Sequence, residues 1–359
     1  MSRSTALIMA AAAFTCANAM ASDLFVQFNL ASDVPGLAKF TDPGLVNPWG
    51  ISASSGSPMW LSINGNGTSE LYNGLGVKNT GLVVTIPGDE TPTGTVFANI
   101  AGSFNGDAFL FDSEDGTVAG WRGALGTTAE TLKLPDPANV YKGIADANIG
   151  GNGYAYLANF RAGTIDVLKG NGGAPDLTGH FTDPSLPAGY APFNVQNLGG
   201  VLYVTYAVQD GAAHDDVPGA GHGIVDAFDL QGNLISRLVT GGALNSPWGL
   251  ALAPAGFGNF GGDLLVGNFG DGLINAYNPT TGAMQGTLLD TSGADLAIDG
   301  LWGLRFGNGA GGASPNTLYF TAGLDGESHG LFGEIVNAPE PGTWLLLGMG
   351  VLPLLRKRR

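Results

Sequence analysis

Six side chains of the types that ligate metals stand out, because they precede or interrupt short apolar runs of the sequence. Four of them lie in one Gly-containing segment, residues 209–222, which holds two of the four histidines. Histidine and carboxylate ligands suit Zn²⁺ or another transition metal, whereas Asn and Asp oxygens suit a hard cation such as Ca²⁺. A divalent metal is therefore the cofactor that the sequence suggests, and its candidate ligands are Asp299, Asn194, His214, Asp215, Asp216 and His222.

In a second interpretation, the same residues bind no metal and have a structural role only. Asn, Asp and Gly are the residues that tight turns require, so these side chains could simply end strands and face water. The spacing of the histidines and carboxylates matches no established metal motif. Three tryptophans, Trp49, Trp248 and Trp302, pose a similar choice between stacking on a sugar and packing in the core. Their recurrence at equivalent points of a repeat favours packing.

Other kinds of chemistry lack their motifs. The sequence has no Gly-x-Ser-x-Gly elbow, P-loop, dinucleotide fingerprint or His-Glu-x-x-His. The one cysteine, Cys16, lies near the N-terminus. With 14 basic and 30 acidic residues the net charge is -16, which repels nucleic acid, so we expect no nucleic-acid partner. These features favour a binding protein over an enzyme.

A repeat in residues 23–337 must position these side chains. A unit begins with a Pro/Trp/Gly-like start, continues as a short apolar strand, and adds further strands separated by Gly-rich turns. Starts occur at residues 47–51, 141–144, 191–195, 246–252 and 301–304, and a less regular unit spans 108–121. Six units at a spacing of roughly 45–55 residues are typical of a β-propeller.

The predicted fold class is therefore all-β, a single propeller with six blades of four antiparallel strands. Five or seven blades are the alternatives, and a β-sandwich is the rival fold. A strand over 24–30 precedes the first start, and we expect it to pair with the last blade and close the ring, which removes two sheet edges.

Both ends carry the pattern of targeting signals. Residues 1–22 combine Arg3, an apolar run and small residues at an Ala-x-Ala site, which is the order of a secretory signal peptide. A lipoprotein signal using Cys16 is the alternative. At the other end, residues 338–359 combine Pro339, Glu340 and Pro341 with a short apolar run and a basic tail. This segment resembles the PEP-CTERM sorting signal, and a plain tail anchor is the alternative.

That resemblance implies a processing partner and a destination. Its family is processed by an exosortase-type membrane protease in Gram-negative bacteria that make extracellular polysaccharide. It implies transient inner-membrane association through a C-terminal transmembrane helix, followed by a place at the cell surface or in the extracellular matrix. The body resembles an uncharacterised family of secreted, NHL-like propellers, on the segments 42–50, 114–117, 190–197 and 267–272.

Two hypotheses for function follow. The first is a non-enzymatic propeller that binds extracellular polysaccharide, an envelope protein or a cation through its loops. The second is a metal-dependent hydrolase or lactonase with its site at the mouth of the central channel, using Asp299, Asn194 and neighbouring oxygens. The second rests on analogy with lactonase-like propellers at the level of fold.

Overall fold

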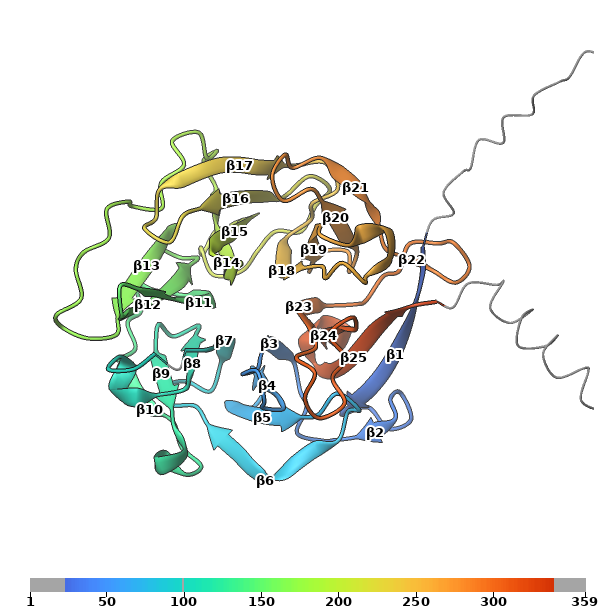
Figure 1. The fold of residues 1–359 in the computed structure, drawn as a ribbon, viewed down its shortest axis with the longest axis horizontal. Helices are drawn as coiled ribbons and strands as arrows, with labels where there is room; N and C mark the ends of the chain where they lie inside the picture. Colours follow the sequence, from blue (N-terminus) through green and yellow to red (C-terminus); the bar gives the residue numbers. More distant parts are fainter. Residues whose placement is uncertain (1–22, 99, 339–359) are drawn as a thin grey trace, which may run out of the picture.

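Six sheets surround a central channel in the computed structural model, which describes residues 23–98 and 100–338 (Figure 1). The predicted signal peptide and sorting segment, including Pro339, Glu340 and Pro341, lie outside the described residues. Within the described part of the chain, none of the helices has the length and apolar character needed to cross a membrane.

The first three sheets follow in chain order around the ring. Blade 1 contains β3 (Pro48–Ser52), β4 (Met59–Ile63), β5 (Thr68–Tyr72) and β6 (Lys78–Thr85). Blade 2 contains β7 (Pro92–Phe97), β8 (Phe109–Ser113), β9 (Val118–Trp121) and β10 (Glu130–Lys133). Blade 3 contains β11 (Tyr141–Ile149), β12 (Asn152–Asn159) and β13 (Thr164–Lys169).

The other three sheets complete the ring. Blade 4 contains β14 (Tyr190–Leu198), β15 (Val201–Val208), β16 (Ile224–Phe228) and β17 (Leu234–Thr240). Blade 5 contains β18 (Pro247–Leu252), β19 (Leu264–Asn268), β20 (Ile274–Tyr277) and β21 (Met284–Thr287). Blade 6 contains β23 (Leu301–Phe306), β24 (Leu318–Gly323), β25 (His329–Asn337) and β1 (Leu24–Ser32), and β2 (Phe40–Thr41) and β22 (Leu289–Asp290) pair with β1. The helices are short: η1 (Phe104–Gly106), η2 (Gly123–Leu125), η3 (Gly258–Phe260) and α1 (Leu324–Glu327).

The prediction of six blades is confirmed, and five of them have the predicted four antiparallel strands or more. Blade 3 differs, because its sheet has three strands within the described residues. The chain after β13 contains Pro175, Pro184 and Pro187. Proline has no amide hydrogen to donate to a strand ladder, which explains why this segment does not continue the sheet.

The glycine of the repeated start is required by contact between blades. A Cβ atom on Gly50 would lie 2.7 Å from the backbone nitrogen of Thr95 in blade 2. A Cβ atom on Gly249 would lie 2.7 Å from the carbonyl oxygen of Trp302, and one on Gly303 would lie 2.7 Å from that of Trp49. At these positions the backbone of one inner strand lies so close to the backbone of the next that there is no room for a side chain, and only glycine fits.

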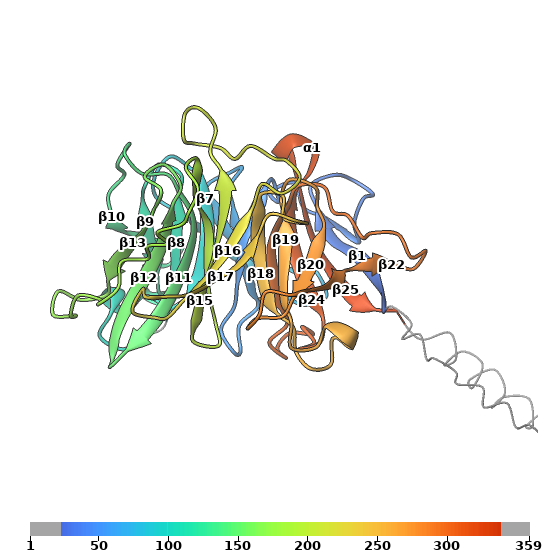
Figure 2. The same cartoon turned by 90° about the horizontal axis from the view of Figure 1, so that it is seen from above.

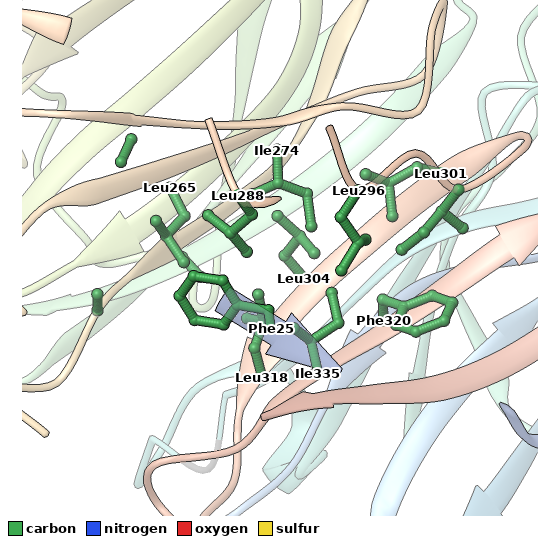
Figure 3. Packing of buried hydrophobic residues seen from close by; sticks show 14 of the residues in the cluster. Phe25, Leu265, Ile274, Leu288, Leu296, Leu301, Leu304, Leu318, Phe320 and Ile335 are labelled. Carbon is green, nitrogen blue, oxygen red and sulfur yellow. The ribbon is translucent and has the colours of Figure 1, made fainter. Parts of the chain in front are cut away.

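Strand β1 closes the ring as predicted, since it pairs antiparallel with β25, from Phe25 opposite Asn337 to Ser32 opposite Leu331. The side chain of Phe25 is 1% exposed and packs in the core between blades 5 and 6 with Leu288, Leu318 and Ile335 (Figure 3). Its ring centroid lies 4.9 Å from that of Phe257. The N-terminal strand is thus held by both hydrogen bonds and apolar contact.

Several carboxyl groups are enclosed by the blades. Burial raises the pKa of Asp112, Asp146 and Asp226 to about 7 in each case. The Asp112 side chain accepts hydrogen bonds from the amide of Gly94 at 2.7 Å and the hydroxyl of Thr93 at 3.0 Å, so it joins two strands of blade 2.

These carboxyls make stability depend on pH. In the unfolded chain they titrate near pH 3.9, so between pH 4 and 7 the folded protein holds protons that the unfolded chain has released. The free energy of unfolding must therefore fall as pH rises through this window and level off above it. We expect Tm to be roughly 5 °C higher at pH 5 than at pH 8 in thermal unfolding followed by circular dichroism. Asp112→Asn should flatten this dependence, and a Tm that rises from pH 5 to 8 would contradict the assignment.

Candidate functional site

One face of the propeller carries the start of each inner strand and the loop between the second and third strands of each blade, and we call it the upper face. Figure 2 shows α1 and the yellow-green loop between β15 and β16 projecting from this face. Directly beneath it, a cluster of aromatic rings fills the channel: Trp49, Phe160, Phe193, Trp248, Trp302 and the partly buried Phe269. The rings of Trp49 and Trp302 stack at 3.6 Å, so the prediction that the tryptophans pack in the core is confirmed.

A buried lysine lies at the centre of the upper face. The side chain of Lys142, in β11, is 2% exposed. Its Nζ lies 2.5 Å from Oε1 of Glu114 and 3.2 Å from Oδ1 of Asp215, and 5.2 Å from the centroid of the Trp49 ring. Burial opposes the charge on Lys142, but Glu114 and Asp215 outweigh it and hold its pKa above the usual value. The lysine is therefore an ammonium ion at neutral pH.

Amide side chains extend this ion pair across the face. Asn64 donates to Oε2 of Glu114 at 3.2 Å, and Asn47 donates both to Oδ1 of Asn64 at 3.1 Å and to Oε1 of Glu327 at 3.1 Å. The indole nitrogen of Trp302 donates to Oδ1 of Asn47 at 3.3 Å. We call Asn47, Asn64, Glu114, Lys142, Asp215 and Glu327 the polar ring. Its members come from five blades, so the assembly of the propeller is what brings them together.

Glu327 is presented by a strained turn. Asp325 and Glu327 in α1 adopt φ values of 51° and 69°, which are uncommon for residues other than glycine. The carboxylate of Asp299 accepts a hydrogen bond from the amide of Asp325 at 2.9 Å and so supports this turn. Burial raises the pKa of Glu327, with Glu114 and Asp215 adding to the effect. Glu327 therefore keeps its proton to a higher pH than an ordinary glutamate.

The structure distributes the six predicted metal ligands over different environments. His214 and Asp215 lie beside Glu114, with Nδ1 of His214 at 2.9 Å from Oδ1 of Asp215. Burial raises the pKa of Asp216, the next residue in the same loop. Nδ1 of His222 faces the carbonyl oxygen of Val217 at 2.9 Å. Asn194 is buried and donates to the carbonyl of Trp248 at 2.8 Å, so its amide joins blades 4 and 5.

The ligand set of Glu114, His214 and Asp215 is compact enough for a metal, since one ligand atom from each lies within 4.8 Å of the others. The ammonium of Lys142, however, already contacts both carboxylates. A cation entering this set would meet a like charge at close range. The residues therefore fit a divalent metal only if Lys142 is displaced or loses its proton.

The central residue of the site had a signal in the sequence. In the repeated start, Lys142 takes the position that Trp49, Phe193, Trp248 and Trp302 take in other blades. The position is aromatic in these four blades and is Thr93 in blade 2. A charged residue at a buried position that most blades fill with an aromatic ring marks a place where the channel needs a charge. Asn64 and Glu327 carry a weaker signal. Their loops have ordinary turn composition, but each follows the second strand of its blade and therefore lies on the face where the inner strands start.

The fold and the polar ring define a six-bladed β-propeller with a buried ion pair at the centre of its upper face. No family model matches the sequence. The uncharacterised protein R648 of Acanthamoeba polyphaga mimivirus is 34% identical over 326 residues, which cover 85% of this chain and 78% of the relative. The uncharacterised protein L690 of the same virus is 32% identical over 323 residues, 84% of this chain and 83% of the relative. The chain belongs to the family of these proteins.

Solved structures resemble the chain in fold. A glucose dehydrogenase superposes with a TM-score of 0.52 and 12% sequence identity, over 88% of this chain and 100% of that one. A streptogramin B lyase gives a TM-score of 0.49 at 12% identity, over 88% of this chain and 97% of that one. At such identity the likeness concerns the propeller alone.

Proposed function

We propose that the protein is an exported binding propeller whose upper face holds a polyhydroxylated ligand such as a segment of extracellular polysaccharide. The observation that carries the proposal is the polar ring. In it the Lys142 ammonium pairs with the carboxylates of Glu114 and Asp215. The amides of Asn64 and Asn47 hold the carboxyl groups of Glu114 and Glu327. Carboxylates and amides held in place are suited to accept and donate hydrogen bonds to hydroxyl groups.

The exposure of Asp215 and of its neighbour His214 supports this role. The side chain of Asp215 is 67% exposed and that of His214 is 38% exposed, so both can reach a ligand above the face. The partly buried ring of Phe269 stacks on Trp302 at 4.0 Å and adds an apolar surface near the polar groups. An apolar ring beside a few fixed polar groups is the usual composition of a small-ligand site.

Export is supported by the two ends of the sequence. The signal-like residues 1–22 and the segment with Pro339, Glu340 and Pro341 motivate transport, processing by an exosortase-type protease and delivery to the cell surface or matrix. Mass spectrometry of the protein recovered from culture medium and from the envelope tests this part. A chain that retains both ends and stays in the cytoplasm would contradict export and leave the ligand proposal standing.

We expect Asp215→Asn to weaken binding of isolated polysaccharide at least about tenfold, because a neutral amide replaces the exposed acceptor. Lys142 keeps Glu114 as a partner in this variant, so Tm should change little. Isothermal titration calorimetry on the full chain measures the affinity. Asp176→Asn is the matched control, since Asp176 forms an exposed pair with Lys169 outside the polar ring. Equal loss in both variants, or no binding by the unmodified protein, would overturn the proposal.

The alternative is a metal-dependent hydrolase or lactonase, and the grouping of Glu114, His214 and Asp215 favours it. We expect Ca²⁺, Mn²⁺ and Zn²⁺ to leave the Tm of the chelator-treated protein unchanged within about 1 °C, because the Lys142 ammonium occupies this position. Differential scanning calorimetry measures the shift. A metal-dependent rise in Tm, with hydrolysis of lactones or esters that His214→Ala abolishes, would favour the enzyme instead.

A further inference from the structure

The central channel has a second end, opposite the upper face. A cavity of about 310 Å³ lies there, lined by residues of all six inner strands, β3, β7, β11, β14, β18 and β23. Its lining follows the aromatic cluster along the same strands: Ile51 comes two residues after Trp49, Leu250 two after Trp248, and Leu304 two after Trp302. The rings therefore close the cavity on the side of the upper face, and it opens at the exposed Gly199 and Leu252.

The cavity combines apolar and polar walls with a cation that has no carboxylate partner. Its polar lining includes Gln196, Asn197 and the carboxyl group of Asp146. Burial raises the pKa of Asp146 to about 7, so this group is largely neutral below that pH. Ile144, Leu250 and Leu304 are buried apolar lining residues. Arg305 also lines it, and within the described residues the one hydrogen bond of its guanidinium goes from Nη2 to the carbonyl oxygen of Ala53 at 2.9 Å. Nε of Arg305 is buried without a hydrogen-bond partner, and so is the hydroxyl of Thr95, another lining residue.

The lack of a counter-charge is unusual for a guanidinium in this position. Two other arginines of the propeller have one: Arg122 pairs with Asp107 and Glu130, and Arg237 pairs with Asp183. Arg161 bonds to a backbone carbonyl instead, but it lies outside the cavity. Among residues 23–98 and 100–338, no carboxylate lies within 4.0 Å of the Arg305 guanidinium, and burial is what lowers its pKa. An enclosed cation without an anion is costly unless a partner arrives from outside.

We propose that this cavity is a second binding site, for a small monocarboxylate with an apolar body, whose carboxylate pairs with Arg305. The planar guanidinium can bind a carboxylate with two parallel hydrogen bonds, and the apolar walls can cover the hydrocarbon part. The volume lies at the lower end of the range for small-molecule pockets, which suits a short chain or a single ring. This site is independent of the polar ring, since the aromatic cluster lies between them.

Charge selectivity in the unmodified protein is the first test. Octanoate, 1-octanol and octylammonium share one apolar chain and differ in the head group. In calorimetric titrations of the full chain we expect octanoate to bind at least about tenfold more tightly than the other two. Equal affinity for octanoate and 1-octanol, or no binding of octanoate, would overturn the proposal. This arm needs no variant, so it holds even where substitutions disturb folding.

Variants locate the site. Arg305→Met keeps the length of the side chain and removes the charge, so it should reduce octanoate affinity at least about tenfold and leave 1-octanol unchanged. Arg161→Met is the matched control, because Arg161 is likewise bonded to one backbone carbonyl, that of Pro137 at 2.7 Å, outside the cavity. Asp215→Asn should leave octanoate binding intact, which separates this site from the polar ring. An equal loss in the Arg305 and Arg161 variants would assign the effect to net charge and refute the site.

Discussion

Replacing Phe25 by alanine is expected to lower the free energy of unfolding by about 3–5 kcal/mol, the usual cost of removing a buried aromatic ring. Phe25 is 1% exposed, and its ring packs against Phe257 and Phe260 of the neighbouring blade. It also lies in the strand that closes the ring, so the cavity left behind would weaken the junction of blades 5 and 6. Urea titration followed by tryptophan fluorescence measures the change.

The same strand supplies the control for this experiment. Phe28 also lies in β1 but is 48% exposed, so Phe28→Ala removes a ring of equal size that makes little core contact. Its effect on the free energy of unfolding should stay near or below about 0.5 kcal/mol. If the two variants were equally unstable, the β-strand propensity of phenylalanine would hold β1 in place. The burial of the Phe25 ring would then not be the reason that the strand closes the propeller.

The second large effect concerns the ion pair of the polar ring. We expect Lys142→Met to lower the free energy of unfolding by about 3–5 kcal/mol, since it leaves the largely buried carboxylate of Glu114 without its cation. In the double variant Lys142→Met with Glu114→Gln, the carboxylate left without its cation is that of Asp215, which is 67% exposed and solvated by water. This variant should therefore recover most of the loss. Urea titrations of the two single variants and the double variant form a cycle that measures the coupling.

An exposed pair shows what the burial contributes. Nζ of Lys169 lies 2.5 Å from Oδ1 of Asp176, and the two side chains are 34% and 92% exposed. Lys169→Met should therefore change the free energy of unfolding by no more than about 1 kcal/mol. For the polar ring itself, the variant with both Lys142→Met and Glu114→Gln is decisive. If it were as unstable as Lys142→Met alone, the lysine would act through its contact with the Trp49 ring and not through its charge.

The six-bladed architecture could be predicted from the sequence because the contacts between neighbouring blades require similar residues in each repeat. Gly50, Gly249 and Gly303 recur because a neighbouring inner strand passes too close for a Cβ atom, and Gly94 and Gly143 meet the same constraint. Blade 4 is the exception, with Asn194 at this position. The closure by residues 24–30 was predictable for a related reason, since a strand without a repeat start had to complete a sheet. Four strands were predicted for every blade, but blade 3 has three. The repeat sets the number of blades, whereas the prolines after β13 decide whether a fourth strand can form there.

The candidate site was less predictable. Residue type brought His214 and Asp215 into the prediction, and the structure does place them together beside Glu114. Asn194 was chosen for the same reason, but its amide joins Trp248 of the next blade, a contact that depends on how blades pack. The pair between Lys142 and Asp215 spans 73 positions of the sequence and depends on the conformation of a long loop. No local pattern encodes that distance. Whether any of the six candidates ligates a metal stays a prediction.

The closure of the ring has a consequence for mechanical force. Phe25 near the start of β1 lies opposite Asn337 at the end of β25, so the chain enters and leaves this antiparallel pair at the same end (Figure 1). Tension applied between those two points would load the hydrogen bonds of the pair one after another, as in a zipper, and not all at once. A pull on the two ends therefore breaks one hydrogen bond at a time, starting from the end of the pair where Phe25 faces Asn337.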